Sequence, residues 1–155
     1  MTPAIRLLKK QKIKFTMHEY THDKNSVSYG LEAVEKMGVD EQLVFKTLVV
    51  ALDRGELVVA IIPVAEKLNM KLVAKAFSAK KAQMANKEDV LRSTGYVMGG
   101  VSPLGQKKRL KTVINISALE LETIFVSAGK RGLEVQLKPL DLQQILQAKS
   151  AFVCA

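Results

Sequence analysis

The chain has 155 residues, of which 48% are hydrophobic and 25% are charged, as expected for one globular domain spanning residues 1–155. No apolar run approaches the roughly 20 residues of a membrane span, the N-terminus lacks the apolar core of a signal peptide, and a lone cysteine excludes an intrachain disulfide. We therefore expect a cytoplasmic protein, and the net charge of +9 favours a polyanionic partner.

The first half of the chain predicts two helices, a half-buried strand and an apolar hairpin. Thr2 is a good N-cap for a helix that Pro3 opens, and Gly38 is placed to end the second helix. Both arms of the hairpin are apolar, so the pair should lie deep in a sheet. The expected elements are a helix over 2–11, a strand over 13–20, a helix over 31–37, and hairpin strands over 44–50 and 57–62.

The second half predicts three more helices and several short strands. Asn69 and Asn86 are typical N-caps. The expected elements are helices over 69–77, 86–95 and 142–148, strands over 96–98, 112–116, 123–127 and 133–137, and an edge strand over 151–154. Because adjacent strands alternate irregularly with helical crossovers, we expect an α/β fold of the α+β type, with a mixed central sheet, partly barrel-like, and helices packed around it.

Lys46 lies in the middle of the apolar segment Val44–Val50. A buried ammonium group is costly unless another group compensates it. The side chain must therefore either extend to the surface along its aliphatic stem or face a cleft where an anion or a polar ligand meets it. We favour the cleft and treat Lys46 as a candidate site residue.

Two glycine-containing loops follow predicted strands. In Gly99-Gly100-Val101-Ser102-Pro103, the adjacent glycines permit positive φ and let backbone amides approach a ligand oxygen. In Ser127-Ala128-Gly129-Lys130-Arg131-Gly132, a serine at a strand end is placed to donate to a ligand. Each loop has a simpler interpretation: a plain turn in the first case, and a hairpin turn with solvated cations in the second.

The usual catalytic sets are missing from the sequence. His18 and His22 share no helix face, and no cysteine or pair of carboxylates completes a metal site with them. Cys154 lies one residue from the end of the chain, and a chain end that frays would not hold a catalytic thiol in position. We expect no metal, no cofactor, and a mechanism that needs no strong protein nucleophile.

Several segments together resemble the YbaK family. They are Thr2-Pro3-Ala4-Ile5, Phe45-Lys46-Thr47-Leu48, the run TGYVMGGVSPLG at 94–105 and the run SAGKRG at 127–132, and they follow the family's order over nearly the whole chain. The family consists of free-standing trans-editing proteins related to the editing domain inserted in bacterial prolyl-tRNA synthetases. The pattern is most similar to the branch that hydrolyses cysteine mischarged on proline tRNA, Cys-tRNA(Pro).

This resemblance implies a deacylase that orients its substrate instead of attacking it. In the family, the thiol of the mischarged cysteine attacks its own ester carbonyl and releases a cyclic thiolactone, and such orientation alone can contribute about 7–11 kcal/mol. Lys46 matches the essential lysine, which would contact the substrate backbone or the terminal phosphate, and Gly99–Pro103 matches the loop that holds the terminal ribose and the ester. The resemblance assigns catalytic roles to Lys46, Gly99, Gly100 and Ser127, and substrate binding to Tyr20, Tyr29, Thr47, Val101, Ser102, Pro103, Gly129 and Glu134.

Two of these positions depart from the family's pattern. Tyr29 stands where phenylalanine is common, and Glu134 stands where aspartate or a small polar residue is usual. The added hydroxyl of Tyr29 leaves open a deacylase for alanine or serine that uses a bound water. A non-catalytic tRNA- or synthetase-binding module is the third hypothesis. The expected partners are the aminoacylated 3′ end of tRNA(Pro) and prolyl-tRNA synthetase, with a ternary complex as one arrangement, and no membrane.

Overall fold

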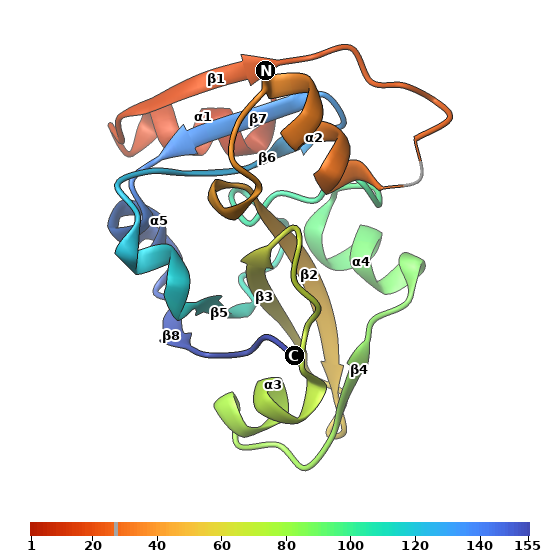
Figure 1. Cartoon of the computed structure of the whole chain (residues 1–155). Helices are drawn as coiled ribbons and strands as arrows, with labels where there is room; N and C mark the ends of the chain where they lie inside the picture. The colour runs from red at the N-terminus through yellow and green to blue at the C-terminus, as the bar shows by residue number, and fades with distance from the viewer. Residues whose placement is uncertain (27) are drawn as a thin grey trace.

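Two β-sheets with helices packed around them make up the fold (Figure 1). The computed structural model describes residues 1–26 and 28–155. The strands in these ranges are β1 (Phe15–Glu19), β2 (Phe45–Leu52), β3 (Leu57–Pro63), β4 (Ala82–Met84), β5 (Lys111–Asn115), β6 (Ile124–Lys130), β7 (Leu133–Leu137) and β8 (Lys149–Ala151). The helices are α1 (Pro3–Lys10), α2 (Tyr29–Met37), α3 (Met70–Ala76), α4 (Lys87–Thr94) and α5 (Pro139–Leu146), with short 3-10 helices η1 (Glu41–Leu43) and η2 (Ile116–Glu120).

The larger sheet is mixed and has the strand order β4-β2-β3-β5-β8. The β2–β3 hairpin is antiparallel, whereas β5 pairs with β3 in parallel and β8 pairs with β5 in parallel. The smaller sheet has the order β1-β7-β6 and is antiparallel throughout. An isolated parallel bridge between Val44 and Phe125 joins the two sheets. The predicted mixed α/β class is confirmed, and the described strands form two sheets instead of a closed barrel.

The predicted helix boundaries follow local capping chemistry. The side chains of Thr2, Asn69 and Asn86 each accept a hydrogen bond from a backbone amide in the first turn of the helix that follows. Gly38 and Gly95 end α2 and α4 in the left-handed conformation. The last helix begins earlier than predicted, because Pro139 occupies its first position.

The strand predicted over 96–98 is wrong. Gly95 turns the chain into a left-handed conformation, and the Gly100 amide donates to the Val97 carbonyl at 2.9 Å, so this segment makes a turn. Val97 and Met98 are exposed. The short edge strand β4 was not predicted, and β8 covers Lys149–Ala151, so it shares only Ala151 with the strand predicted over 151–154.

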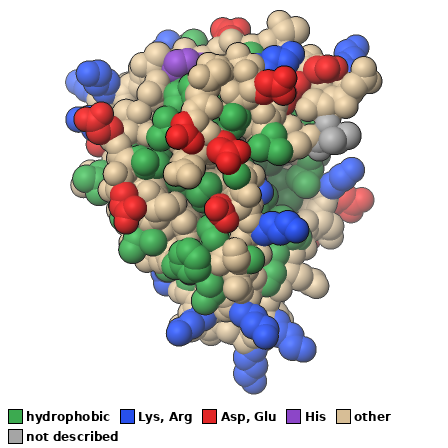
Figure 2. Space-filling model, in the orientation of Figure 1, with side chains coloured by type: hydrophobic (Ala, Val, Ile, Leu, Met, Phe, Trp, Pro, Cys, Tyr) green, Lys and Arg blue, Asp and Glu red, His purple; other side chains and the backbone are tan. Residues whose placement is uncertain are grey.

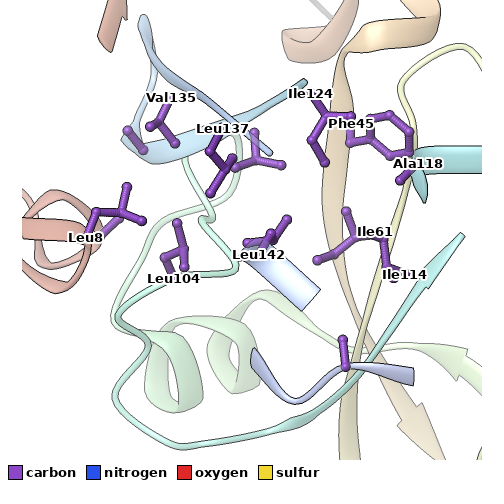
Figure 3. Close-up of a cluster of buried hydrophobic side chains, with 14 of the residues drawn as sticks. Leu8, Phe45, Ile61, Leu104, Ile114, Ala118, Ile124, Val135, Leu137 and Leu142 are labelled. Carbon is purple, nitrogen blue, oxygen red and sulfur yellow. The ribbon is translucent and has the colours of Figure 1, made fainter. Parts of the chain in front are cut away.

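The main hydrophobic core lies between the two sheets. Figure 3 shows Ile61 and Ile114 of the larger sheet facing Leu142 of α5, and Leu8 of α1 lies on the side of Val135. A second cluster fills the other face of the larger sheet, beneath α3. None of the described helices has the length and apolar character that crossing a membrane requires.

Candidate active site

The two sheets meet at a cavity of about 320 Å³, at the lower end of the range of roughly 300–1,000 Å³ for small-molecule sites. A recess is visible there in Figure 2, between the positions of α2 and the end of α4. We call it the main cavity. It is lined by Tyr20, Ser28, Tyr29, Gly30, Ala33, Val44, Phe45, Lys46, Thr47, Leu48, Val64, Met98, Gly99, Val101, Ser127 and Glu134.

Lys46 occupies β2 opposite Ile62 of β3 and lines the main cavity. Its side chain is half-buried, and Nζ donates to the Val64 carbonyl at 3.2 Å. Among the residues that the structure describes, no carboxylate forms an ion pair with it. Burial lowers the pKa of the Lys46 ammonium, and the nearby Cys154 and Glu66 oppose this shift. The ammonium is therefore held by one carbonyl and has hydrogens left for a ligand.

Two hydroxyl groups in the main cavity have unused hydrogen-bonding capacity. Thr47 Oγ1 is buried and has no hydrogen-bond partner within the described part of the chain. Ser127 Oγ accepts from the Gly129 amide at 3.2 Å, which leaves its own hydrogen free to donate. A buried polar atom without a partner is costly, so Thr47 is a position where a ligand atom would restore a lost hydrogen bond.

Glu134 lies directly across the β6–β7 pair from Ser127. It is 7% exposed, and burial raises the pKa of its carboxyl to about 8. At neutral pH the group is therefore mostly a neutral carboxylic acid that can donate a hydrogen bond. Burial, with a contribution from the charges of Glu134 and Glu32, also raises the pKa of the Tyr20 phenol to about 12. The side of the cavity formed by Glu134 and Tyr20 is consequently mostly uncharged at pH 7.

Gly99 has φ of +87° and no room for a side chain. A Cβ atom there would lie 2.6 Å from Arg131 Nε and 2.7 Å from Tyr29 Cε2. The Arg131 guanidinium carbon lies 4.1 Å from the centre of the Tyr29 ring, and Nη2 donates to the Met98 carbonyl at 3.0 Å. Arg131 thus ties the β6–β7 turn to α2 and to the Gly99 turn beside the main cavity.

Four of the predicted site residues do not line the main cavity. The Gly100 amide is used in the turn, and a Cβ atom at this position would lie 2.9 Å from Lys130 Cα. Ser102 is fully buried, and its Oγ accepts from the Leu104 amide at 3.2 Å. Pro103 lines a different cavity beside α1, and Gly129 packs against the Tyr96 ring. These residues shape the loops around the cavity.

The fold and the cavity can be compared with known proteins. A family model described as an aminoacyl-tRNA editing domain matches residues 26–145, which is more than half of the chain. The chain belongs to the family of aminoacyl-tRNA editing domains. The YbaK resemblance found in the sequence is thereby confirmed at the level of the family.

Relatives of this editing domain are both free-standing and part of larger proteins. EbsC of Enterococcus faecalis, provisionally named a Cys-tRNA(Pro)/Cys-tRNA(Cys) deacylase, is 36% identical over 138 residues, covering 89% of the chain and 84% of EbsC. A proline–tRNA ligase of Trichlorobacter lovleyi is 26% identical over 111 residues, covering 72% of the chain and 19% of the ligase. A crystal structure provisionally described as a trans-editing enzyme for prolyl-tRNA synthetase superposes with a TM-score of 0.84 at 19% identity, covering 100% and 99% of the two chains, which supports the fold.

Several lining residues of this editing domain were not predicted. Gly30 lies in the first turn of α2, where a Cβ atom would be 2.6 Å from Val64 Cγ1. A glycine inside a helix was the available signal for such close packing.

His22 pairs with the buried Glu32 at 2.6 Å, and His18 contacts Gln136 at 3.0 Å, so each histidine has a structural partner. In the described ranges, no three His, Cys, Asp or Glu residues are grouped to hold a metal ion.

Proposed function

We propose that this editing domain is a cytoplasmic trans-editing deacylase that releases cysteine from mischarged Cys-tRNA(Pro), with the tRNA 3′ end and prolyl-tRNA synthetase as partners. One observation carries the proposal: the partly free ammonium of Lys46 and the unpartnered hydroxyl of Thr47 lie in one cavity with Ser127. Family membership and the name of EbsC support the reaction class.

The proposed reaction uses the substrate's own thiol as the nucleophile. The cysteine sulfur attacks the ester carbonyl carbon and loses its proton, while the bond between this carbon and the ribose oxygen breaks. The ribose oxygen takes up a proton, so the products are tRNA with a free hydroxyl and a cysteine thiolactone that water later opens. Holding sulfur and carbonyl together is the main requirement, and this can contribute about 7–11 kcal/mol to catalysis.

The residues of the main cavity fit this requirement. Neither histidine nor cysteine lines the cavity among the described residues, and the carboxyl of Glu134 is mostly protonated at pH 7, so the Ser127 hydroxyl has no strong base beside it to activate it. The Lys46 ammonium is placed to hold the terminal phosphate or the carbonyl oxygen. The Thr47 and Ser127 hydroxyls are placed to bind the ester and the amino group.

Glu134 adds a neutral donor to the same site. Because burial raises the pKa of its carboxyl to about 8, it does not repel the negative charge that develops on the carbonyl oxygen at pH 7. An aspartate has a side chain shorter by one methylene, so Glu134 reaches further into the cavity than the usual residue of the family would. The proposed contact is a hydrogen bond from the protonated carboxyl to the substrate.

Glu134 also favours a second candidate function. A carboxyl with a pKa of about 8 is mostly protonated at pH 7, but its ionised fraction is a base strong enough to accept a proton from a bound water, and this water would hydrolyse an alanyl or seryl ester directly. In that case the thiol of the substrate would be unnecessary. The two candidates therefore differ in which group attacks the carbonyl carbon.

A single deacylation experiment separates these functions. One proline tRNA is charged with cysteine, S-methylcysteine, alanine or serine, and each ester is incubated with and without the protein. The thiol mechanism predicts rapid release of cysteine alone. Equal release of cysteine and S-methylcysteine contradicts it and supports the bound water. Salt-sensitive tRNA binding that leaves every ester intact would instead support a non-catalytic module.

A further inference from the structure

A second cavity, of about 400 Å³, lies on the other side of the segment Pro63–Glu66 from the main cavity. Pro63, Ala65 and Glu66 line the second cavity, while Val64 between them lines the main cavity. We call the second cavity the acidic cleft. Its lining residues are Glu41, Gln42, Pro63, Ala65, Glu66, Asn115, Ser117, Glu120, Leu121, Phe152 and Cys154.

The charge of the acidic cleft is opposite to that of the chain. Glu41, Glu66 and Glu120 are all exposed, and no basic side chain within the described ranges forms an ion pair with any of them. They come from three separate parts of a chain whose net charge is +9. Figure 2 shows acidic side chains over the middle of this face, with basic ones at its lower end and around its upper edge.

The acidic cleft also has apolar side chains to bury. Phe152 lines the cleft and is 59% exposed, and Leu121 lines it beside Glu120. Ile116, next to the lining residue Asn115, is 48% exposed. Aromatic residues with a polar rim are typical of the anchoring centre of a protein interface.

We propose that the acidic cleft docks a protein partner that presents lysine or arginine side chains around an aliphatic anchor. This inference rests on the proposed function, in which the partner is prolyl-tRNA synthetase. Charge complementarity selects this occupant, because three carboxylates repel the phosphates of RNA. A second copy docked through the same cleft by a twofold axis would set these carboxylates against their equivalents.

The position of the acidic cleft connects the docked partner to catalysis. Glu66 lines the cleft, and its charge opposes the lowering of the Lys46 pKa by burial. Two residues earlier, the Val64 carbonyl accepts the hydrogen bond from Lys46 Nζ. A partner on Pro63, Ala65 and Glu66 therefore contacts the same short segment that holds the lysine of the main cavity.

The test compares two charge-reversed proteins with the same net charge. E41K/E120K reverses two carboxylates of the acidic cleft, and E19K/E35K reverses two exposed carboxylates that do not line it. Glu66 is retained because its charge reaches Lys46. Prolyl-tRNA synthetase is titrated against each protein. We expect the Kd to rise at least about tenfold for E41K/E120K and to stay within about twofold for E19K/E35K.

Cys154 provides an independent measurement, because it is the only cysteine of the chain and lines the acidic cleft. The thiol is only 4% exposed and burial raises its pKa, so alkylation by iodoacetamide is slow and is followed by mass spectrometry over a long time course at alkaline pH. Bound synthetase should slow it at least about threefold, and uncharged tRNA alone should not. A wild-type chain that fails to bind the synthetase, equal Kd values for the two variants, or protection by tRNA alone would each overturn the docking proposal. Deacylation of free Cys-tRNA(Pro) by the wild-type chain tests the proposed function separately.

Discussion

The main cavity and the acidic cleft share the segment Pro63–Glu66 as a wall, yet their ionisable side chains differ in exposure to water. In the main cavity, the carboxyl of Glu134 is buried and held neutral at pH 7, and burial also lowers the pKa of the Lys46 ammonium. In the acidic cleft, Glu66 and two further carboxylates stay in contact with water. Burial therefore decides which groups can take part in chemistry and which serve recognition.

The comparison also separates two kinds of unsatisfied group. Thr47 Oγ1 is buried, so the absence of a hydrogen bond costs free energy in the unliganded chain. The exposed carboxylates of the cleft are solvated, so their lack of ion-pair partners costs little. A ligand is therefore expected to gain affinity from hydrogen bonds in the main cavity, and from charge steering in the cleft.

The largest effect is expected at Lys46. Lys46→Ala removes the only ammonium that lines the main cavity in the described structure, and we expect kcat/KM for Cys-tRNA(Pro) to fall at least about 100-fold. Lys67→Ala, which removes an exposed ammonium next to Glu66, is the matched control and should stay within about twofold. Circular dichroism checks the fold, and a fully active Lys46→Ala protein would contradict the assignment.

The buried carboxyl of Glu134 should make stability depend on pH. Its pKa rises from 4.5 to about 8 on folding, so the folded chain holds a proton that the unfolded chain releases between these values. The free energy of unfolding should therefore fall as the pH rises through this window, by about 1–3 kcal/mol more in the wild type than in Glu134→Gln. Urea unfolding from pH 5 to 9 measures this difference.

The control for that experiment is Glu19→Gln, which changes an exposed carboxyl. Its unfolding curve should run parallel to that of the wild type. A parallel curve for Glu134→Gln as well would mean that the carboxyl of Glu134 is already ionised in the folded chain at neutral pH.

Thr47→Val tests the unpartnered hydroxyl. Removing a buried group without a hydrogen bond should raise the free energy of unfolding by about 1 kcal/mol, while kcat/KM should fall about tenfold. Thr47→Ser keeps the hydroxyl and should retain activity. Thermal denaturation and the deacylation assay together measure both effects. A loss of stability in Thr47→Val would show that the hydroxyl has a partner within the protein.

The smallest effect is expected for Arg131→Lys. Lysine keeps the charge but loses the planar group that stacks on Tyr29 beside Gly99, and we expect kcat/KM to fall about two- to fivefold through a looser cavity rim. Lys130→Arg, at the neighbouring exposed position, should leave the rate unchanged. The split between KM and kcat shows whether the effect lies in substrate binding, and an unchanged KM would argue against a positioning role.

Much of the fold follows from local patterns. Helix ends depend on contacts between residues that are close in sequence. The helices with the N-caps Thr2, Asn69 and Asn86, and those that end at a glycine, α2 and α4, were therefore predicted within a few residues. The cation of Lys46 within an apolar strand marked a cavity because burial of a charge requires an explanation. The segment Tyr96–Met98 was mistaken for a strand because it is apolar, but only Tyr96 is buried, while Val97 and Met98 are exposed at a turn.

Other features depend on contacts that the sequence does not reveal. Residues alternate between the faces of a strand, so Lys46 and Thr47 would not be placed in one cavity by pattern alone. Both line it near the start of β2, where the preceding residue Val44 bridges to Phe125 of the smaller sheet. The acidic cleft joins residues from the turn before β2, the end of β3, η2 and the C-terminal segment, which are far apart in sequence.

The shared segment Pro63–Glu66 makes the two surfaces thermodynamically reciprocal. If a docked synthetase changes the affinity of the main cavity for charged tRNA by some factor, charged tRNA must change the affinity for the synthetase by that same factor. A chain loaded with its substrate would then bind its partner with a different affinity from a chain that has just released its product. Each round of deacylation would then be accompanied by a change in the affinity for the synthetase.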